Sequence, residues 1–125
     1  MIHLDTSFLI LALLPGSPQD GTLREWLRTG EPLGMSTIAW AEFLCGPVEP
    51  HHVGLAERIV SRHFSFEEED AMLTSQLFNE SGRRRGSLAD CMIAGTAVRH
   101  KASLATENPS DFRRFETMGL TVVAK

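Results

Sequence analysis

Residues 1–14 read MIHLDTSFLILALL and place a single acid between two apolar segments. Ile2 and Leu4 fit a short buried strand, and residues 8–14 are too uniformly apolar for a surface helix. Asp5 therefore lies at the junction of two elements that both favour the interior. An ionised carboxylate so close to a core needs a hydrogen bond, an ion pair or a metal ion. The alternative is that Asp5 only caps the helix that follows it.

The composition is that of one globular domain, which we expect to span residues 1–125. Hydrophobic residues make up 42% and charged residues 22%, which are ordinary shares for a soluble protein. The apolar run at residues 8–14 is too short for a membrane span and has no basic leader, so we expect a cytoplasmic protein without a membrane anchor. Cys45 and Cys91 have no CxxC spacing, and we interpret both as reduced core residues.

Two more acids lie among apolar neighbours, both in predicted helices. A helix is expected from Thr37 until Gly46-Pro47, and by three-and-four spacing Glu42 shares one of its faces with Ile38, Ala41 and Cys45. The alternative is a surface acid at the edge of an apolar stripe. Asp90 lies in the first turns of an almost wholly apolar helix over residues 87–98, where a capping box with Ser87 is the competing explanation.

The other segments alternate between strand and helix patterns. We expect helices capped by Asp20 and by Ser65, and the acids of residues 67–70 are assigned to helix-dipole stabilisation and solvent. Further strands are expected near residues 32–36, 63–66, 103–106 and 120–124, and further helices at residues 53–62 and 111–115. This alternation predicts an α/β domain with a mainly parallel sheet, whose binding crevice lies at the carboxyl ends of the strands.

Three acids from separate segments are either unrelated caps and surface groups or parts of one site. Carboxylates that lie within a few ångströms repel one another, so a cluster is stable only if some are protonated or a cation lies between them. Oxygen ligands without Cys or His favour Mg²⁺ or Mn²⁺ over zinc. Such a site binds phosphate oxygens and activates water, so phosphodiester hydrolysis is the chemistry that the acids favour.

Four blocks in this order resemble the PIN-domain ribonucleases, most closely the VapC-type toxins of toxin–antitoxin pairs. They are residues 2–7 (IHLDTS), 37–43 (TIAWAEF), 88–97 (LADCMIAGTA) and 104–112 (LATENPSDF), and the resemblance covers essentially the whole chain. It implies a three-layer α/β/α sandwich with a mainly parallel central sheet, a Mg²⁺ or Mn²⁺ centre and endonucleolytic cleavage of RNA.

The resemblance also assigns roles to the acids. Asp5 and Asp90 match the principal metal ligands of the family, and Glu42 matches the acid that binds the metal directly or through water. The fourth acid of the family falls on Asn108 in this sequence. Either Asp111 or Glu107 then completes the catalytic set, or Asn108 positions a water. The implied groups that orient the carboxylates or touch a phosphate are Thr6, Ser7, Thr106 and Asn108.

The implied partners are an RNA substrate, a cognate antitoxin whose tail enters the active-site groove, and a second copy of the chain in a homodimer. The net charge of −4 argues against a protein coated in positive charge, so RNA has to be attracted by a local basic rim. The same rim is suited to an acidic antitoxin segment. The candidates for this rim are Arg83, Arg84, Arg85 and Arg113.

Three other functions are compatible with parts of the pattern. Related flap-type nucleases cut DNA, although this chain is short for the helical arch that threads a strand. A receiver-like signalling domain also binds Mg²⁺ at strand ends, but Lys101 and Lys125 are the only lysines, and neither follows a strand in the phosphate-pairing position. A degenerate domain that binds partners without catalysis is the third alternative, and the absence of an acid at Asn108 favours it.

Overall fold

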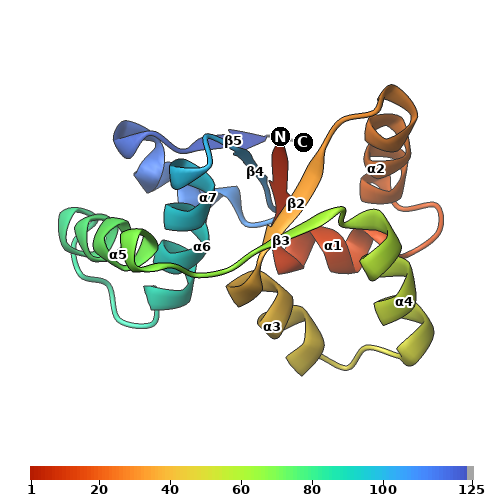
Figure 1. The fold of residues 1–125 in the computed structure, drawn as a ribbon, viewed down its shortest axis with the longest axis horizontal. Helices are drawn as coiled ribbons and strands as arrows, with labels where there is room; N and C mark the ends of the chain where they lie inside the picture. Colours follow the sequence, from red (N-terminus) through yellow and green to blue (C-terminus); the bar gives the residue numbers. More distant parts are fainter. Residues whose placement is uncertain (124–125) are drawn as a thin grey trace.

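A computed structural model describes residues 1–123 and shows one five-stranded sheet in which every strand pair is parallel (Figure 1). The strand order is β3-β2-β1-β4-β5. The chain thus builds outward from β1 to one edge and then returns to the other side of β1, and this reversal of direction marks the point where α/β proteins bind ligands. The strands are β1 (Ile2–Leu4), β2 (Leu33–Ser36), β3 (Arg62–Phe64), β4 (Ser103–Ala105) and β5 (Thr121–Val123).

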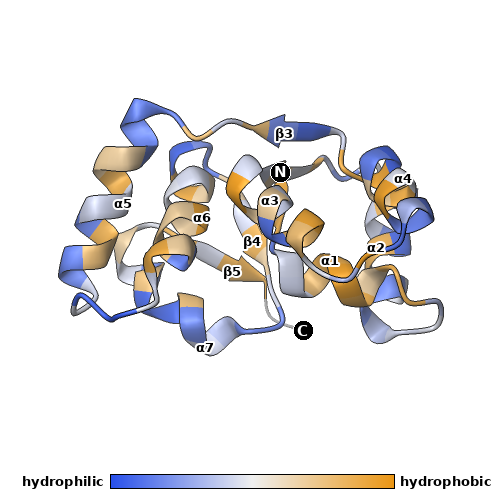
Figure 2. Ribbon diagram, turned by 90° about the horizontal axis from the view of Figure 1, so that it is seen from below, coloured by the Kyte–Doolittle hydropathy of each residue, from blue (hydrophilic) through white to orange (hydrophobic). Residues whose placement is uncertain are grey.

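Helices cover both faces of the sheet, which confirms the α/β/α sandwich. Helices α1, α2 and α4 lie on one side and α5 and α6 on the other, while α3 lies beneath the carboxyl ends of the strands (Figures 1 and 2). The edge strand β3 is hydrophilic (Figure 2). The helices are α1 (Thr6–Ala12), α2 (Pro18–Thr29), α3 (Thr37–Cys45), α4 (Pro50–Ile59), α5 (Glu68–Glu80), α6 (Leu88–Arg99) and α7 (Pro109–Phe112), followed by a 3-10 helix, η1 (Arg113–Met118).

Most predicted elements are present, with shifted ends. The closing strand was expected over residues 120–124, and of these Ala124 lies outside the described residues. None of the helices in the described residues combines the length and hydrophobicity needed to span a bilayer.

Helix α6 is buried along its small residues, as the sequence predicts, and a Cβ added at Gly95 would lie 3.2 Å from Thr74 Oγ1 of α5. A larger residue at this position would therefore require Thr74 to shift by a few tenths of an ångström.

The predicted caps of two helices are wrong by one turn or less. Ser17, not Asp20, caps α2, because its hydroxyl accepts the N–H of Asp20. Helix α5 begins after Glu67 rather than after Ser65, and the Asp70 carboxylate accepts the backbone N–H of Glu67 at 2.8 Å. Serine and the acids are all good N-cap residues, so the sequence alone does not fix which of them begins the helix.

The predicted apolar face of α3 is also wrong. The buried side chains are Ala39 and Phe43, whereas Ala41, Glu42 and Cys45 are exposed. Cys45 is therefore a free surface thiol, and only Cys91 is the buried residue that we expected. Nearly every position of α3 except Glu42 is apolar, so periodicity does not identify its inward face.

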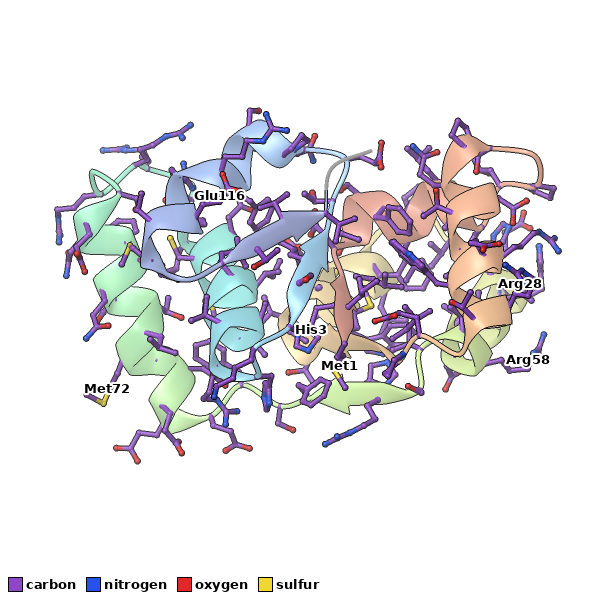
Figure 3. The ribbon with its side chains drawn as sticks, turned by 90° about the horizontal axis from the view of Figure 1, so that it is seen from above. Met1, His3, Arg28, Arg58, Met72 and Glu116 are labelled. Carbon is purple, nitrogen blue, oxygen red and sulfur yellow. The ribbon has the colours of Figure 1, made fainter. Side chains whose placement is uncertain are left out.

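His3 in β1 is an unusual core residue. It is 1% exposed and packs against the rings of Phe64 and His100 (Figure 3). Both of its ring nitrogens are buried without a hydrogen-bond partner in the part of the chain that the structure describes. Burial, and then the charge of His100, lowers the pKa of His3 from 6.5 to about 4. The fold therefore accepts His3 in its neutral form only.

We expect acid to destabilise the protein through His3. Below pH 6.5 the unfolded chain binds a proton at His3. The native state does not bind this proton until the pH falls to about 4. The free energy of unfolding then loses at most about 2 kcal/mol between pH 7 and pH 5 from this residue. Urea denaturation at both pH values should show a smaller loss in His3→Leu than in wild type or in the surface control His51→Gln. An equal loss in all three proteins would contradict the prediction.

Candidate functional site

The three acids singled out by the sequence line one cleft at the carboxyl ends of the strands. Asp5 directly follows β1, Glu42 lies on α3, which follows β2, and Asp90 lies in the first turn of α6. The cleft has a volume of about 360 Å³, and its other lining residues are Thr6, Ser7, Ile10 and Asn108. The structure thus brings together acids that lie up to 85 positions apart in the sequence. They lie beside the boundary between β1 and β4, where the direction in which the chain adds strands to the sheet reverses.

Asp5 occupies the N-cap position of α1, but its side chain makes no capping hydrogen bond and is held by hydroxyl groups instead. The carboxylate is 5% exposed, and its Oδ2 accepts hydrogen bonds from Ser7 Oγ and Thr106 Oγ1, both at 2.8 Å. Each hydroxyl also accepts a backbone N–H from the loop after β4, from Glu107 to Ser7 and from Asn108 to Thr106, both at 3.0 Å. Each hydroxyl proton is thereby directed to the carboxylate. Asp5 is fixed in one orientation by two elements about 100 residues apart.

Thr6 has a different role from its neighbour. Its hydroxyl donates to the backbone carbonyl of Ala39 at 2.8 Å and so joins the start of α1 to α3. Because Glu42 lies one turn further along α3, this bond fixes the distance between the helix that carries Glu42 and the segment that carries Asp5. Among the side chains that the resemblance assigned to supporting roles, Ser7 and Thr106 contact an acid directly, and Thr6 positions the backbone of α3.

The acids affect one another's protonation. Partial burial, and then the charges on Asp5 and Asp90, raise the pKa of Glu42. Partial burial, and then the charges on Asp5 and Asp111, raise the pKa of Asp90, while Arg114 and Arg84 oppose that rise. Raised carboxyl pKa values with like-charged neighbours are the electrostatic sign of a cluster that a cation would stabilise.

Of the three candidates for the fourth position of the site, two lie at or near the cleft. Asn108 lines the cleft, whereas Asp111 lies on α7 and affects the cleft through its charge on Asp90. Glu107 is directed elsewhere, because it accepts a hydrogen bond from Gln19 Nε2 at 2.7 Å. Glu107 is therefore the poorest of the three candidates for a fourth ligand.

The predicted basic rim lies only partly at the cleft. Arg84 affects Asp90, but Arg83 bonds Asn79 and lies over the ring of Phe78 at the end of α5. Arg85 and Arg113 are exposed. Sequence reasoning missed Arg114, which opposes the rise in the pKa of Asp90 and stacks on Phe115. Two of its guanidinium nitrogens are buried without a partner among residues 1–123. The Arg113-Arg114 pair was visible, but the change from α7 to a 3-10 helix determines which of the two turns inward.

The donor set of the cleft fits a hard divalent cation. Its lining residues offer carboxylates, hydroxyls and an amide, with neither Cys nor His, which is the chemistry of Mg²⁺ or Mn²⁺. The carboxyl oxygens of Asp5, Glu42 and Asp90 are not all within 4.8 Å of one another in the described residues, so the side chains have to approach one another to share one ion. Such an opening is expected where three carboxylates repel each other.

Comparison with protein families matches residues 2–117 to the PIN domain. The fold is similar to that of FitAcB from Neisseria gonorrhoeae, at 24% identity and a TM-score of 0.74, over 99% of this chain and 97% of the other. A toxin–antitoxin complex from Klebsiella pneumoniae gives the same four values. VapBC2 from Rickettsia felis, bound to a DNA fragment from its promoter, matches at 21% identity and a TM-score of 0.74 over 98% of each chain. No curated protein matches the chain.

Proposed function

The chain belongs to the PIN-domain family, and we propose that it is a divalent-metal-dependent endoribonuclease that acts as the toxin of a type II toxin–antitoxin pair. The observation that carries the proposal is the cleft shared by Asp5, Glu42 and Asp90. Three unrelated caps would not meet in one cleft, and Asp5 makes no side-chain cap at all. We also propose that residues 1–125 form one nuclease domain.

We propose that Asp5 and Asp90 bind the cation directly and that Glu42 binds it directly or through water. When bound, Mg²⁺ or Mn²⁺ supplies Lewis-acid polarisation of the phosphodiester and neutralises the charge that develops on it. Ser7 and Thr106 hold Asp5 in its binding orientation. Glu42 is exposed at the cleft and is placed to accept a proton from the attacking water. Asn108 or Asp111 positions that water.

RNA reaches a cleft that is negatively charged, so cations nearby have to offset the repulsion. Arg84 and Arg114 are the arginines whose charge reaches Asp90, and we propose that they attract the phosphates that flank the cleavage site. Arg85 and Arg113 extend this rim on the exposed surface. The same positive charges suit an acidic segment of an antitoxin.

The proposed partner is a cognate antitoxin, since the matched structures include complexes that are described as toxin–antitoxin or VapBC assemblies. A homodimer is the proposed state of the chain by itself. Because the chain belongs to the PIN family, we do not propose that it is a receiver-like signalling domain. A degenerate binding domain remains the second candidate, because Asn108 lies in the cleft where the fullest family pattern has an acid.

The decisive assay uses end-labelled structured RNAs, an equivalent single-stranded DNA, and protein purified without a metal-binding tag. We expect RNA cleavage with Mn²⁺ or Mg²⁺ and none with excess EDTA, with 5′-phosphate and 3′-hydroxyl products, because the carboxylates by themselves repel the phosphate. Restoration of cleavage when Mn²⁺ is added back after EDTA is the control for irreversible damage. Cleavage of the DNA alone would favour a flap-type nuclease, and the absence of any metal-dependent cleavage would favour a degenerate domain.

A further inference from the structure

A second group of metal-ligating side chains lies outside the acidic cleft, at the start of α4. The ligand atoms of Glu49, His51 and His52 all lie within 4.8 Å of one another. His51 Nδ1 is 3.3 Å from Glu49 Oε2, and the two imidazole rings are 4.0 Å apart between their centroids. We propose that these three residues form a binding site for a divalent transition-metal ion of the Zn²⁺ type.

The geometry of the first pair matches a tetrahedral site. With metal–ligand bonds of about 2.0–2.1 Å, two ligand atoms of a tetrahedron are about 3.3 Å apart. The 3.3 Å between His51 Nδ1 and Glu49 Oε2, which is also the distance of an ordinary ion pair, is close to this spacing. Two imidazoles and one carboxylate are a set that Zn²⁺ accepts, and they leave a fourth position open to water. The hard donors of the acidic cleft favour a different class of ion.

The backbone fixes the three ligands relative to one another. The carbonyl of Glu49 accepts the N–H groups of His52 and Val53 at 2.9 and 3.2 Å, which closes the first turn of α4 around Pro50. Glu49 occupies the N-cap position, yet its side chain makes no capping hydrogen bond. The carboxylate is thus not used to cap the backbone of α4, and its side-chain contact is with His51. Its negative charge also offsets the positive end of the helix dipole, which by itself disfavours a cation here.

The proposed site is next to the acidic cleft without being part of it. His52 lines a small cavity together with Ile10 and Phe43, and Ile10 also lines the acidic cleft. An ion at α4 would join the connection between α3 and α4 to the first turn of α4. Because α3 carries Glu42, the ion would stabilise the part of the fold that positions one wall of the cleft.

Isothermal titration with Zn²⁺ tests the proposal, using tag-free full-length protein in buffer that contains excess Mg²⁺. We expect wild type and Asp90→Asn to bind one equivalent of Zn²⁺ at α4, and His51→Gln and His52→Gln to lose that equivalent. His63→Gln is the control for an exposed imidazole elsewhere and should bind as wild type does. Zn²⁺ should raise the melting temperature of wild type and of His63→Gln, but not of His51→Gln.

Co²⁺ gives a second measurement that does not depend on affinity alone. A site with two imidazoles and a carboxylate should produce the intense visible bands of four-coordinate Co²⁺, and these should be absent in His51→Gln. The proposal is overturned if His51→Gln retains the Zn²⁺ equivalent, if Asp90→Asn loses it, or if the bands persist without His51. Each variant is first checked by circular dichroism, and a His51 or His52 variant that is misfolded is replaced by Glu49→Gln.

Discussion

Asp5→Asn and Asp90→Asn are each expected to lower the rate of RNA cleavage at least about 100-fold, since loss of even an indirect partner of a metal ligand typically costs 10–100-fold. The amide keeps the shape of the side chain but removes the charge that a cation requires. In Asp5→Asn the amide oxygen still accepts the Ser7 and Thr106 hydroxyls, so the network at the end of β1 is kept. The measurement is the initial rate of cleavage of a labelled RNA in Mn²⁺.

Both variants are also expected to be at least as stable as wild type in EDTA. Each substitution removes a charge that raises the pKa of at least one neighbouring acid, Glu42 or Asp90, so the metal-free fold loses repulsion. Glu116→Gln, which removes an exposed acid from η1, is the matched control and should change neither rate nor melting temperature. If both variants unfold, and the cleavage rate of wild type is the same in EDTA, the acids are structural and the proposed function is wrong.

The acidic cleft was predictable because its signals are local. Asp5, Glu42 and Asp90 each lie among apolar neighbours, and two of them are at or near the point where a strand gives way to a helix. In a parallel sheet the carboxyl ends of strands share one edge, so their positions after β1 and β2 bring Asp5 and Glu42 together. The sequence predicts where the site lies better than it predicts which face of α3 is buried. Helix α3 is apolar at nearly every position, so its sequence has no periodic pattern that marks one face as the inward one.

The features that the sequence did not predict depend on partners that are distant in the sequence or on the residue at which a helix begins. Asp70 was assigned to solvent with the other acids of residues 67–70, yet it is completely buried and pairs with Arg99, 29 positions later. Its orientation follows from a helix that begins at Glu68 rather than two residues earlier. Arg114 and the Glu49 cluster are similar cases, because a change of one residue in helix register would turn each side chain away.

Asp70→Asn is expected to lower the free energy of unfolding by about 3 kcal/mol, the low end of the cost of breaking a buried ion pair. The Asp70 side chain is 0% exposed and accepts two hydrogen bonds from Arg99, at 2.5 Å from Nε and 3.1 Å from Nη2. Asparagine retains the bond from the N–H of Glu67 but offers Arg99 no charge. The low end applies because the Arg99 side chain is 25% exposed and regains water.

A double-mutant cycle separates the pair from the packing around it. Asp70→Asn, Arg99→Met and the double variant are compared by urea denaturation, and the double variant should lose less than the sum of the single losses, because the two residues share one interaction. Glu25→Gln is the control, since Glu25 pairs with Arg28 on the surface, where such pairs contribute little. Strictly additive losses would show that Asp70 stabilises α5 through its cap alone. In that case any loss in Arg99→Met would come from contacts of Arg99 other than its pair with Asp70.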